Sequence, residues 1–477
     1  MTDSIIKEFE KIVYNMPDNI ALLSESEGEM TYMQLDQYAN YIAKCIYGNF
    51  PDGKRIGVCI DRSFLLIAAI LGVYKAGCAY VPLDPAYPLD RLEYYIVEAK
   101  VDCVLVSTDN AGKFANEIIL QQKVKYEVKS IIYKESSLAY ILFTSGSTGV
   151  PKGVLVNHDA ILNTLKWRIK YYGLTSKDVV IQIPSFSYSS SIEDIFSTLL
   201  SGGKLLIIKS SQLLNPKKIV YLIRKFQITH FLMIPSLYKE IMKNMKSDDE
   251  NKLRFVVVAG ENLDSTTIDR HFSVVPNARL YNEYGMTETC VGCMVAQITN
   301  SNQAGYIGNL IPNMKKIINC LDNEIYGELL IGGKGLAEGY TDGKNLRFVT
   351  INGERYFCTG DYVKQKEEGI YYVGRKDSQI KINGQRVDLS EIEEIGNNYV
   401  KGVDIKAVGF KFSGRTAICC FVSGKKESDI FLVKSEIEKR LPSFYMPQRF
   451  MYMGVFPRLP NGKIDVVKLK ELLRDEN

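Results

Sequence analysis

Ten residues at 144–153, Thr-Ser-Gly-Ser-Thr-Gly-Val-Pro-Lys-Gly, combine the groups that bind phosphate in a loop. The three glycines allow positive φ angles that turn backbone N–H groups inward, the hydroxyls add short donors, and Lys152 adds a positive charge. The spacing is not that of a Walker loop, because Pro151 and Gly153 stand where a second glycine and a magnesium-binding hydroxyl belong. The loop follows a strand-like run and precedes a helical segment from His158, which argues against a flexible linker. The loop therefore predicts a nucleotide site that is built differently from a Walker site.

The elements that must position this loop alternate between strand-like and helical patterns from Arg55 to Asp361. This alternation predicts an α/β fold in which helices cover largely parallel sheets. The β-rich runs stand at 56–60, 80–83, 179–183, 205–208, 230–234 and 255–259.

Near Asp377 the pattern changes to a small α+β module. Helices are expected at 389–397, at 428–440 and from Asp465, and strands at 406–412 and 417–422. We therefore expect a large domain over 1–376 and a small mobile domain over 377–477. No Pro, Gly or Ser linker stands at the boundary, which predicts a tight hinge at Asp377.

Composition limits the classes of partner. The 59 basic and 55 acidic residues leave a net charge of only +4 without a basic block, which argues against nucleic acid and favours small molecules. The longest apolar run, 64–73, is about half a membrane span, and the N-terminus has the pattern of an amphipathic helix rather than a signal peptide. We expect a cytoplasmic protein without a membrane anchor. Cys290 and Cys293 have metal-ligand spacing, but the lack of a second pair argues against zinc.

Further segments, in a fixed order, resemble the adenylate-forming enzymes over nearly the whole chain. They are 74–88 with Arg91, 281–289, 327–333 with Gly339 and Tyr340, 356–361, 374–387 and 459–463. The first, Tyr-Lys-Ala-Gly-Cys-Ala-Tyr-Val-Pro-Leu-Asp-Pro-Ala-Tyr-Pro, is very similar to the amino-acid-activating domains of nonribosomal peptide synthetases. Met286 stands where this branch usually has proline and favours the acyl-CoA ligase side.

The resemblance implies a reaction that uses ATP and Mg²⁺. Attack of a carboxylate on the α-phosphate brings two anions together, so catalysis must consist mostly of positioning and charge neutralisation. By resemblance Lys463, which follows a Pro-Asn-Gly turn, bridges the two anions, Glu288 holds magnesium and Thr148 holds the phosphates.

The resemblance also implies the nucleotide site. Asp361 would accept from the ribose hydroxyls, Arg375 would assist at ribose or phosphate, and Tyr284 would stack on adenine. The other implied nucleotide-binding residues are Thr144, Ser145, Gly146, Ser147, Gly149, Lys152, Gly260, Glu261, Asn282, Glu283, Gly285, Met286 and Thr287.

In this family the small domain rotates after adenylation, so that Lys463 leaves and the loop around Gly384 helps to form a channel for pantetheine. No carrier segment follows Asn477 and no condensation-like domain precedes Met1. We therefore expect a stand-alone, monomeric enzyme that loads the phosphopantetheine arm of a separate carrier protein.

The acid pocket departs from the family pattern. Ser189 stands where enzymes for α-amino acids have the Asp that pairs with the α-ammonium group. The other pocket positions carried over by resemblance are Ser190, Glu193, Leu232, Val257, Ala259, Glu283, Val291 and Gly292, of which Leu232 has the weakest alignment. The pocket has lost one acid and gained two.

A neutral Ser189 argues against an ordinary α-amino acid, because a buried ammonium without a counter-charge costs several kcal/mol. Glu193, one helical turn further, would place a carboxylate about 5–6 Å from the lost one. We therefore expect an acid with an amino or guanidino group at the β-position or beyond. The alternative for Glu193 and Glu283 is that they face solvent or pair internally.

Two other functions stay open. An aryl- or acyl-CoA ligase for an uncharged acid is favoured by Met286 and opposed by the segment 81–88. A non-catalytic nucleotide-binding module is opposed by the presence of Lys463 and Glu288.

Overall fold

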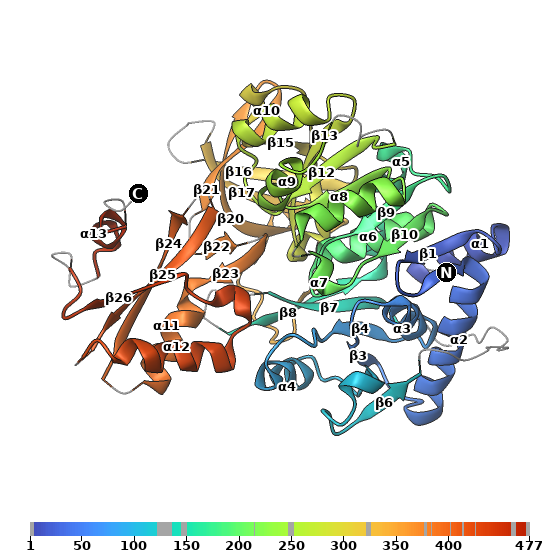
Figure 1. Cartoon of the computed structure of the whole chain (residues 1–477), viewed down its shortest axis with the longest axis horizontal. Helices are drawn as coiled ribbons and strands as arrows, with labels where there is room; N and C mark the ends of the chain where they lie inside the picture. The colour runs from blue at the N-terminus through green and yellow to red at the C-terminus, as the bar shows by residue number, and fades with distance from the viewer. Residues whose placement is uncertain are drawn as a thin grey trace. The chain divides into compact units, whose positions relative to one another are not determined.

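The computed structural model describes residues 4–121, 136–144, 150–213, 215–246, 252–320, 326–375, 379–382, 384–400, 402–412, 415–424, 426–458 and 464–473 (Figure 1). Contacts between residues divide the chain into two compact units. The first comprises Met1–Pro85, Tyr95–Phe143 and Gly153–Lys376, and the second comprises Ala86–Tyr94, Thr144–Lys152 and Asp377–Asn477.

In the described residues, one sheet of seven strands has the order β18-β8-β7-β4-β3-β5-β6. Strands β7, β4, β3, β5 and β6 pair in parallel, and β18 pairs with β8 in the antiparallel direction. The strand β7, which is parallel to β4, ends at Thr144, where the glycine-rich segment begins. The strands are β3 (Arg55–Cys59), β4 (Ala79–Pro82), β5 (Cys103–Ser107), β6 (Glu117–Leu120), β7 (Leu138–Thr144), β8 (Lys152–Asn157) and β18 (Gly339–Tyr340).

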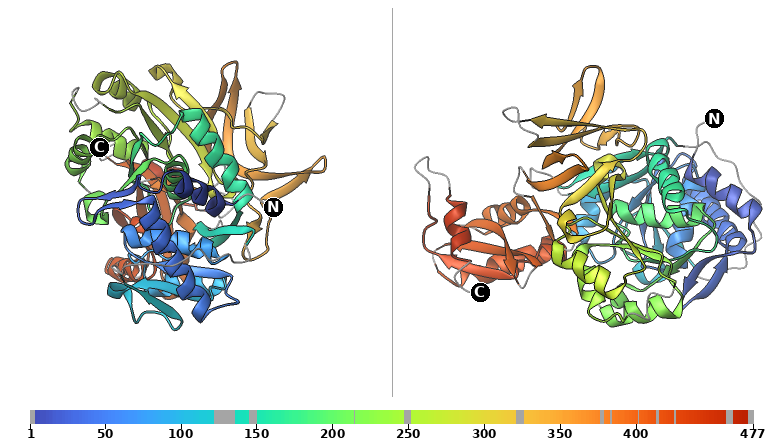
Figure 2. Two further views of the ribbon diagram at one scale, coloured as in Figure 1. Left: turned by 90° about the vertical axis from the view of Figure 1, so that its right-hand side faces the viewer. Right: turned by 90° about the horizontal axis from the view of Figure 1, so that it is seen from above.

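A second sheet has fourteen strands in the described part of the chain. Parallel pairing joins β1, β10, β9, β11, β12 and β13 in that order. Antiparallel pairing joins β2 to β1 at one edge and begins again between β13 and β14. The strands are β1 (Ile20–Ser24), β2 (Gly28–Thr31), β9 (Val179–Gln182), β10 (Lys204–Ile207), β11 (His230–Met233), β12 (Phe255–Ala259), β13 (Arg279–Met286), β14 (Val291–Ile298), β15 (Tyr306–Leu310), β16 (Met314–Cys320), β17 (Tyr326–Gly333), β19 (Phe348–Ile351), β20 (Glu354–Lys366) and β21 (Gly369–Arg375). The predicted α/β class is confirmed, and the antiparallel half, yellow to orange in Figure 2, is an addition that the alternating pattern did not predict.

The helices before β15 are α1 (Ile5–Asn15), α2 (Tyr32–Asn49), α3 (Phe64–Lys75), α4 (Leu89–Glu98), α5 (His158–Tyr172), α6 (Ser189–Leu200), α7 (Ser210–Leu213), α8 (Pro216–Lys225), α9 (Pro235–Met242) and α10 (Ser265–Val274). The apolar run 64–73 forms most of α3, and every residue of that helix is buried. No helix in the described ranges is both long enough and apolar enough to span a membrane.

Strand alternation decides which helices cover which face of the fourteen-stranded sheet. On β11–β13, Phe231, Val256 and Leu280 pack in one cluster with α8, α9 and α10. The alternate residues Leu232 and Val257 pack in another cluster with the end of α5. Helix α6 packs against β9 and β10 on the same side as α5, with which it is in contact.

The second unit contains a small α+β module. A two-stranded sheet joins β22 (Gln379–Ile382) to β23 (Gln385–Asp388), and a three-stranded sheet joins β24 (Asp404–Phe412), β25 (Arg415–Ser423) and β26 (Arg449–Met453). Its helices are α11 (Leu389–Tyr399), α12 (Asp429–Arg440) and α13 (Val466–Glu471). A core that includes Val387, Ile392, Ile418, Val433 and Ile437 holds these elements together.

Candidate active site

The segment that leads into α6 is fixed by a buried arginine. Arg62 donates from Nη1 to the Gln182 carbonyl oxygen at 3.0 Å and from Nη2 to those of Ile183 and Pro184 at 2.9 and 2.6 Å. Its guanidinium also lies over the Phe186 ring, 5.1 Å from the centroid. Burial lowers the pKa of Arg62 to about 10, so this clamp is still cationic at neutral pH. The clamp positions the start of α6, where the pocket residues begin.

Ser189 is the first residue of α6 and is buried, and Ser190 is half-buried. The Ser189 hydroxyl oxygen lies 3.4 Å from that of Thr287, in the segment that follows β13. The two hydroxyls can therefore form a hydrogen bond, and the position that resembles the α-ammonium site holds no carboxylate.

Glu193 and Glu283 converge on Gly292, which brings together three of the predicted pocket residues. Glu193 lies one turn along α6 from Ser189, and both carboxylates are buried, with side-chain exposures of 1%. A Cβ atom on Gly292 would lie 3.2 Å from Oε1 of Glu193 and 3.3 Å from Oε2 of Glu283. A side chain at position 292 would thus crowd the two carboxylates.

Arg168 on α5 binds the second of these carboxylates. Its Nη1 donates to Oε1 and Oε2 of Glu283 at 2.6 and 2.7 Å, and Tyr172 donates to Oε1 at 2.5 Å. The same Nη1 lies 3.4 Å from Oε1 of Glu193, without the alignment of a hydrogen bond. Glu283 therefore pairs internally, as the alternative derived from the sequence allowed, and its charge is taken up by the protein.

The other carboxyl groups of the cluster are less well satisfied. Oε1 of Glu193 and both side-chain oxygens of Asp194 are buried and have no hydrogen-bond partner. Burial and the negative charge of Glu283 raise the pKa of Glu193 to about 8, although Arg168 opposes this. Burial raises the pKa of Asp194 to about 7. Burial alone would lower the pKa of Arg168, but Glu283 and Glu193 raise it, so the guanidinium carries its charge.

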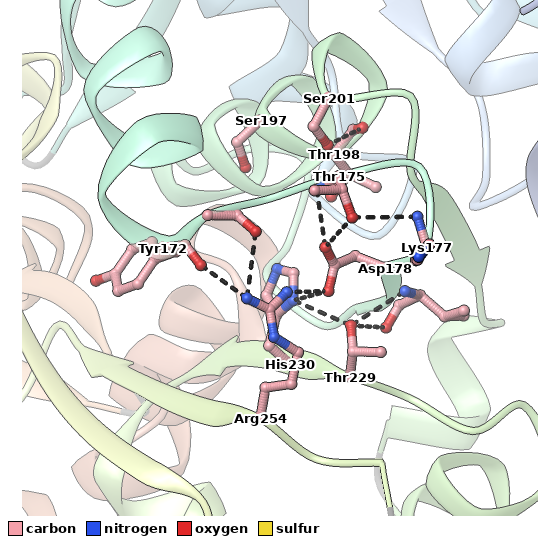
Figure 3. A network of polar contacts seen from close by, with 12 residues as sticks. Tyr172, Thr175, Lys177, Asp178, Ser197, Thr198, Ser201, Thr229, His230 and Arg254 are labelled. Carbon is pink, nitrogen blue, oxygen red and sulfur yellow. Dashed lines mark hydrogen bonds and ion pairs between the residues drawn. The ribbon is translucent and has the colours of Figure 1, made fainter.

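Arg168 and Tyr172 share one face of α5, whose end is held by the network in Figure 3. Arg254 donates from Nη2 to the Tyr172 and Gly173 carbonyl oxygens at 3.0 and 3.2 Å and from Nη1 to Oδ1 of Asp178 at 2.6 Å. A cation at the C-terminal end of a helix satisfies its last carbonyls and is stabilised by the helix dipole. This network fixes the end of the helix that carries Arg168.

Parallel register aligns the remaining pocket residues on one face of the sheet. Leu232 on β11 is the Cα partner of Val257 on β12, and Ala259 is the partner of Glu283 on β13. The placement of Leu232, the least certain from sequence, therefore agrees with that of Val257.

The backbone beside Gly292 is strained. Val291 has φ 76° and follows Cys290 at φ 51°, and a β-branched residue rarely adopts such an angle. Gly285 lies opposite, where a Cβ atom would be 1.6 Å from the Val291 carbonyl oxygen. Only glycine fits at position 285, which is a packing reason for the glycine of the 281–289 segment.

Three residues predicted for the nucleotide come together on the other side of β13. Asp361 is 1% exposed and accepts from the Tyr284 hydroxyl at 2.6 Å and from Nη1 of Arg375 at 2.7 Å. Thr359, whose hydroxyl accepts from the Asp361 backbone N–H at 3.0 Å, holds the same strand in place. Arg375 is the Cα partner of Asp361, so strand register explains their meeting.

Three other residues predicted around the nucleotide, Glu288, Glu261 and Asn282, form hydrogen bonds with partners outside the Asp361 cluster. Glu288 is buried, and its Oε1 accepts from the Tyr340 hydroxyl at 3.0 Å. Glu261 follows Gly260, which has φ 85°, and accepts from the Ser236 backbone N–H and hydroxyl at 3.0 and 3.1 Å. The Asn282 side chain donates to the Tyr306 carbonyl oxygen at 2.7 Å, which is a bond within the sheet.

Several predicted residues lie outside the described part of the chain. They are Ser145, Gly146, Ser147, Thr148, Gly149, Asp377 and Lys463. Of the same motifs, Thr144 ends β7 and Lys152 begins β8, and both are half-buried.

Sequence reasoning missed Arg168, Tyr172 and Arg62. None of them stands in a segment that resembles the family, and an arginine and a tyrosine on a helix are ordinarily interpreted as surface residues. The available signal was the excess of acidic residues in the pocket, which calls for a buried cation as partner.

Comparison with known proteins identifies the family. Residues 9–341 match the family described as AMP-binding enzyme. The chain belongs to this family. Bacitracin synthase 3 of Bacillus licheniformis is 36% identical over 487 residues, which cover 97% of this chain but only 8% of that protein. The chain is an AMP-forming ligase, an adenylation domain of the nonribosomal peptide synthetase type.

Solved structures show the same fold. The Vibrio cholerae adenylation domain AlmE, in complex with glycyl-adenosine-5′-phosphate, has a TM-score of 0.87 at 21% identity, with 100% of this chain and 98% of that chain covered. The o-succinylbenzoate CoA synthetase MenE from Bacillus subtilis has a TM-score of 0.85 at 16% identity, with coverage of 97% and 98%. Both an adenylation domain and a CoA synthetase therefore share this architecture.

Proposed function

We propose that this adenylation domain activates a carboxylic acid with an amino or guanidino group at the β-position or beyond, and then loads the phosphopantetheine arm of a separate carrier protein. The observation that carries the proposal is the combination of two features of α6. Ser189 is neutral, and one turn further Glu193 is buried with an Oε1 that has no hydrogen-bond partner. A cation placed there would gain a counter-charge, whereas an α-ammonium at Ser189 would have none.

In the first half-reaction a carboxylate oxygen of the acid bonds to the α-phosphorus of ATP, and the bond to the β-phosphate breaks with release of pyrophosphate. Asp361, held between Tyr284 and Arg375, would bind the ribose hydroxyls. Lys463 would neutralise the approaching anions by bridging them. Ser189 would orient the acid through its hydroxyl, beside Thr287.

Glu288 fits a magnesium site. Mg²⁺ in nucleotide sites is commonly held by one or two carboxylates together with phosphate oxygens and water, so a single oriented carboxylate is sufficient. The Tyr340 hydroxyl orients Glu288 through Oε1. When bound, the ion supplies charge neutralisation at the phosphates.

In the second half-reaction the thiol of pantetheine attacks the acyl carbon, AMP leaves, and the thiol proton passes to solvent. We place the rotation of residues 377–477 about Asp377 between the two steps. The acceptor is a separate protein in this proposal, and the monomer is the active form, in the biosynthesis of a secondary metabolite.

A CoA ligase for an uncharged acid is the second candidate. Two observations favour it: the raised pKa of Glu193 and Asp194, which makes the pocket less negative, and the Ser189–Thr287 hydroxyl pair, which suits a neutral polar substituent. The chain also shares its fold with MenE, which is a CoA synthetase.

The experiment that tests the proposal is ATP–pyrophosphate exchange with a panel of acids. The panel contains glycine, other α-amino acids, β-alanine, 4-aminobutyrate, β-lysine, guanidinoacetate and hydroxybenzoates. We expect the highest kcat/KM for an acid whose cationic group lies at the β-position or beyond. Preference for a hydroxybenzoate or a neutral α-amino acid would contradict the substrate proposal, and faster thioester formation with CoA than with a holo carrier protein would favour the second candidate.

A further inference from the structure

The charged cluster of the acid pocket has one arginine for three carboxyl groups. Arg168 comes from α5, Glu193 and Asp194 from α6, and Glu283 from β13. All four side chains are buried, so the charges act on each other without screening by water. The way in which the single cation is shared therefore decides what the pocket accepts.

Arg168 interacts more closely with Glu283 than with Glu193. Its Nη1 makes two hydrogen bonds to Glu283, at 2.6 and 2.7 Å, and only a 3.4 Å ion pair with Glu193. Tyr172 adds a third hydrogen bond to Glu283. Glu283 is thus fully engaged by α5, and Glu193 has an oxygen that needs a donor.

The position of that oxygen is defined by Gly292. Oε1 of Glu193 lies 3.2 Å from where a Cβ atom on Gly292 would stand. Asp194 has no such contact with Gly292, although its carboxyl group is also buried without a hydrogen-bond partner. Of the two adjacent acids, Glu193 is therefore the one that faces a predicted pocket position.

We propose that Arg168 is a specificity-determining residue: by holding Glu283 it leaves Glu193 to receive one cationic group of the substrate, and so it sets the pocket for a monocationic acid. The proposal rests on the proposed function, because it concerns the acid of the adenylation reaction. Arg168 occupies the place that a second substrate cation would take at Glu283. Removal of Arg168 alone therefore opens the pocket to a dicationic acid.

Protonation gives this arrangement a second signature. Among the described residues, the titratable groups that interact electrostatically with Glu193 are Arg168 and Tyr172 from α5, Asp194 from α6, Glu283 from β13, Tyr140 from β7 and Cys293 from β14. Glu193, with a pKa of about 8, holds a proton at neutral pH and must release it to solvent when a substrate cation binds. His230 does not titrate in this range, because burial and Arg168 lower its pKa to about 3.

The test compares charge-matched variants. Arg168→Met removes the cation and leaves Glu283 without a counter-charge, whereas the double variant Arg168→Met/Glu283→Gln removes one charge of each sign. Lys166→Met is the matched control, because Lys166 is a cation on the same helix that pairs with a carboxylate, Glu8, outside the pocket. Each variant is assayed for kcat/KM with 4-aminobutyrate, with pentanoate, in which a methyl group replaces the ammonium, and with β-lysine as the dicationic acid.

For Arg168→Met we expect the preference for β-lysine over 4-aminobutyrate to rise by about tenfold or more, since one unpaired buried carboxylate gains a partner. The double variant should retain the preference for 4-aminobutyrate over pentanoate within about threefold, because Glu193 is intact. The Lys166→Met control should leave both preferences unchanged. In the wild type, KM for 4-aminobutyrate should fall as the pH rises from 6 to 8, by up to about tenfold per unit, as expected for release of one proton.

Three outcomes overturn the proposal. If Arg168→Met and the control leave the same preferences, Arg168 has only a structural role. If the double variant loses the preference for the ammonium, the Arg168–Glu283 pair binds the substrate directly. If the wild type prefers pentanoate, the proposed function itself fails, and this result is obtained before any variant is made. Should Arg168→Met not fold, the charge-balanced double variant and the pH profile still decide between these outcomes.

Discussion

Two polar clusters lie on either side of β13, and they differ in how completely their charges are satisfied. On one side Asp361 receives hydrogen bonds on both oxygens, from Tyr284 and from Arg375. On the other side Arg168 satisfies Glu283, but Glu193 and Asp194 retain buried oxygens without hydrogen-bond partners. Glu283 and Tyr284 are consecutive in the strand, so their side chains point in opposite directions.

The difference bears on the proposed recognition of the two substrates. A fully satisfied carboxylate such as Asp361 is preorganised, since no group would have to move before the ribose hydroxyls that it is proposed to bind approach. A carboxyl group buried without a partner is costly in the free protein and gains most when a ligand supplies the missing charge. ATP is the substrate common to the family, and the acid varies, which matches a rigid nucleotide side and an acid side that depends on its ligand.

Loss of a group outside both clusters gives the largest expected effect. Lys463→Ala should slow adenylation by several kcal/mol of barrier, because the variant loses the cation that is proposed to bridge the reacting oxygens. Binding of ATP and of the acid should change little. Single-turnover adenylation and equilibrium binding of ATP measure the two quantities separately, and near-normal pyrophosphate exchange would contradict the proposed role.

Asp361→Asn should be next in size. The amide cannot accept from both ribose hydroxyls while it meets Tyr284 and Arg375, and loss of hydrogen bonds to a charged group costs about 3 kcal/mol, or roughly 100-fold in KM for ATP. KM for the acid should stay within a few-fold, which pyrophosphate exchange at saturating ATP can establish. An equal rise in both KM values would show that the two sides of β13 are not independent.

Glu193→Gln should weaken binding of the acid rather than of ATP, which is the reverse of Asp361→Asn. We expect the cationic acid to bind at least about 2 kcal/mol more weakly, roughly 30-fold, while KM for ATP is unchanged. Asp194→Asn, the neighbouring isosteric change, is the control and should affect the acid much less. Similar losses in the two variants would mean that the cluster acts through its total charge rather than through Glu193.

Much of this comparison could be predicted from the sequence. The runs at 230–234 and 255–259 formed β11 and β12. Asp361 and Arg375, to which the resemblance assigned roles around one nucleotide, are Cα partners on β20 and β21. Local signals of this kind are strong, because hydrophobic alternation and glycine-rich turns depend on neighbours in the chain. Glu193 and Gly292 were also expected in one pocket, and they do lie together.

The partner of Glu283 could not be predicted in the same way. Arg168 lies 115 residues away from Glu283 in the chain, on a helix whose sequence gives no sign that an arginine is fully buried. A side chain of that kind is buried only because three carboxyl groups from other elements surround it, and such a tertiary effect overrides the usual preference of arginine for the surface. The antiparallel strands after β13 were missed for a related reason, since strand direction depends on pairing rather than on local pattern.

The smallest expected effect is on the free energy of unfolding. Its pH dependence reports the protonation of Glu193 without any substrate. In the folded protein the pKa of Glu193 is raised from 4.5 to about 8, so between these values the folded state holds a proton that the unfolded state has released. The stabilisation is therefore complete below about pH 4.5 and is lost as the pH rises towards 8. From pH 6 to 7 the free energy of unfolding of the wild type should fall by about 1 kcal/mol more than that of Glu193→Gln.

Trp167, the single tryptophan of the chain, precedes Arg168 on α5, so its fluorescence reports unfolding at the cluster itself. Asp194→Asn provides the contrast, because a group with a pKa of about 7 contributes little to the slope between pH 7 and 8, where Glu193 should still contribute. Parallel slopes for Glu193→Gln and the wild type across pH 6–8 would show that Glu193 is ionised in the free enzyme and that the acid side, like Asp361, is already satisfied.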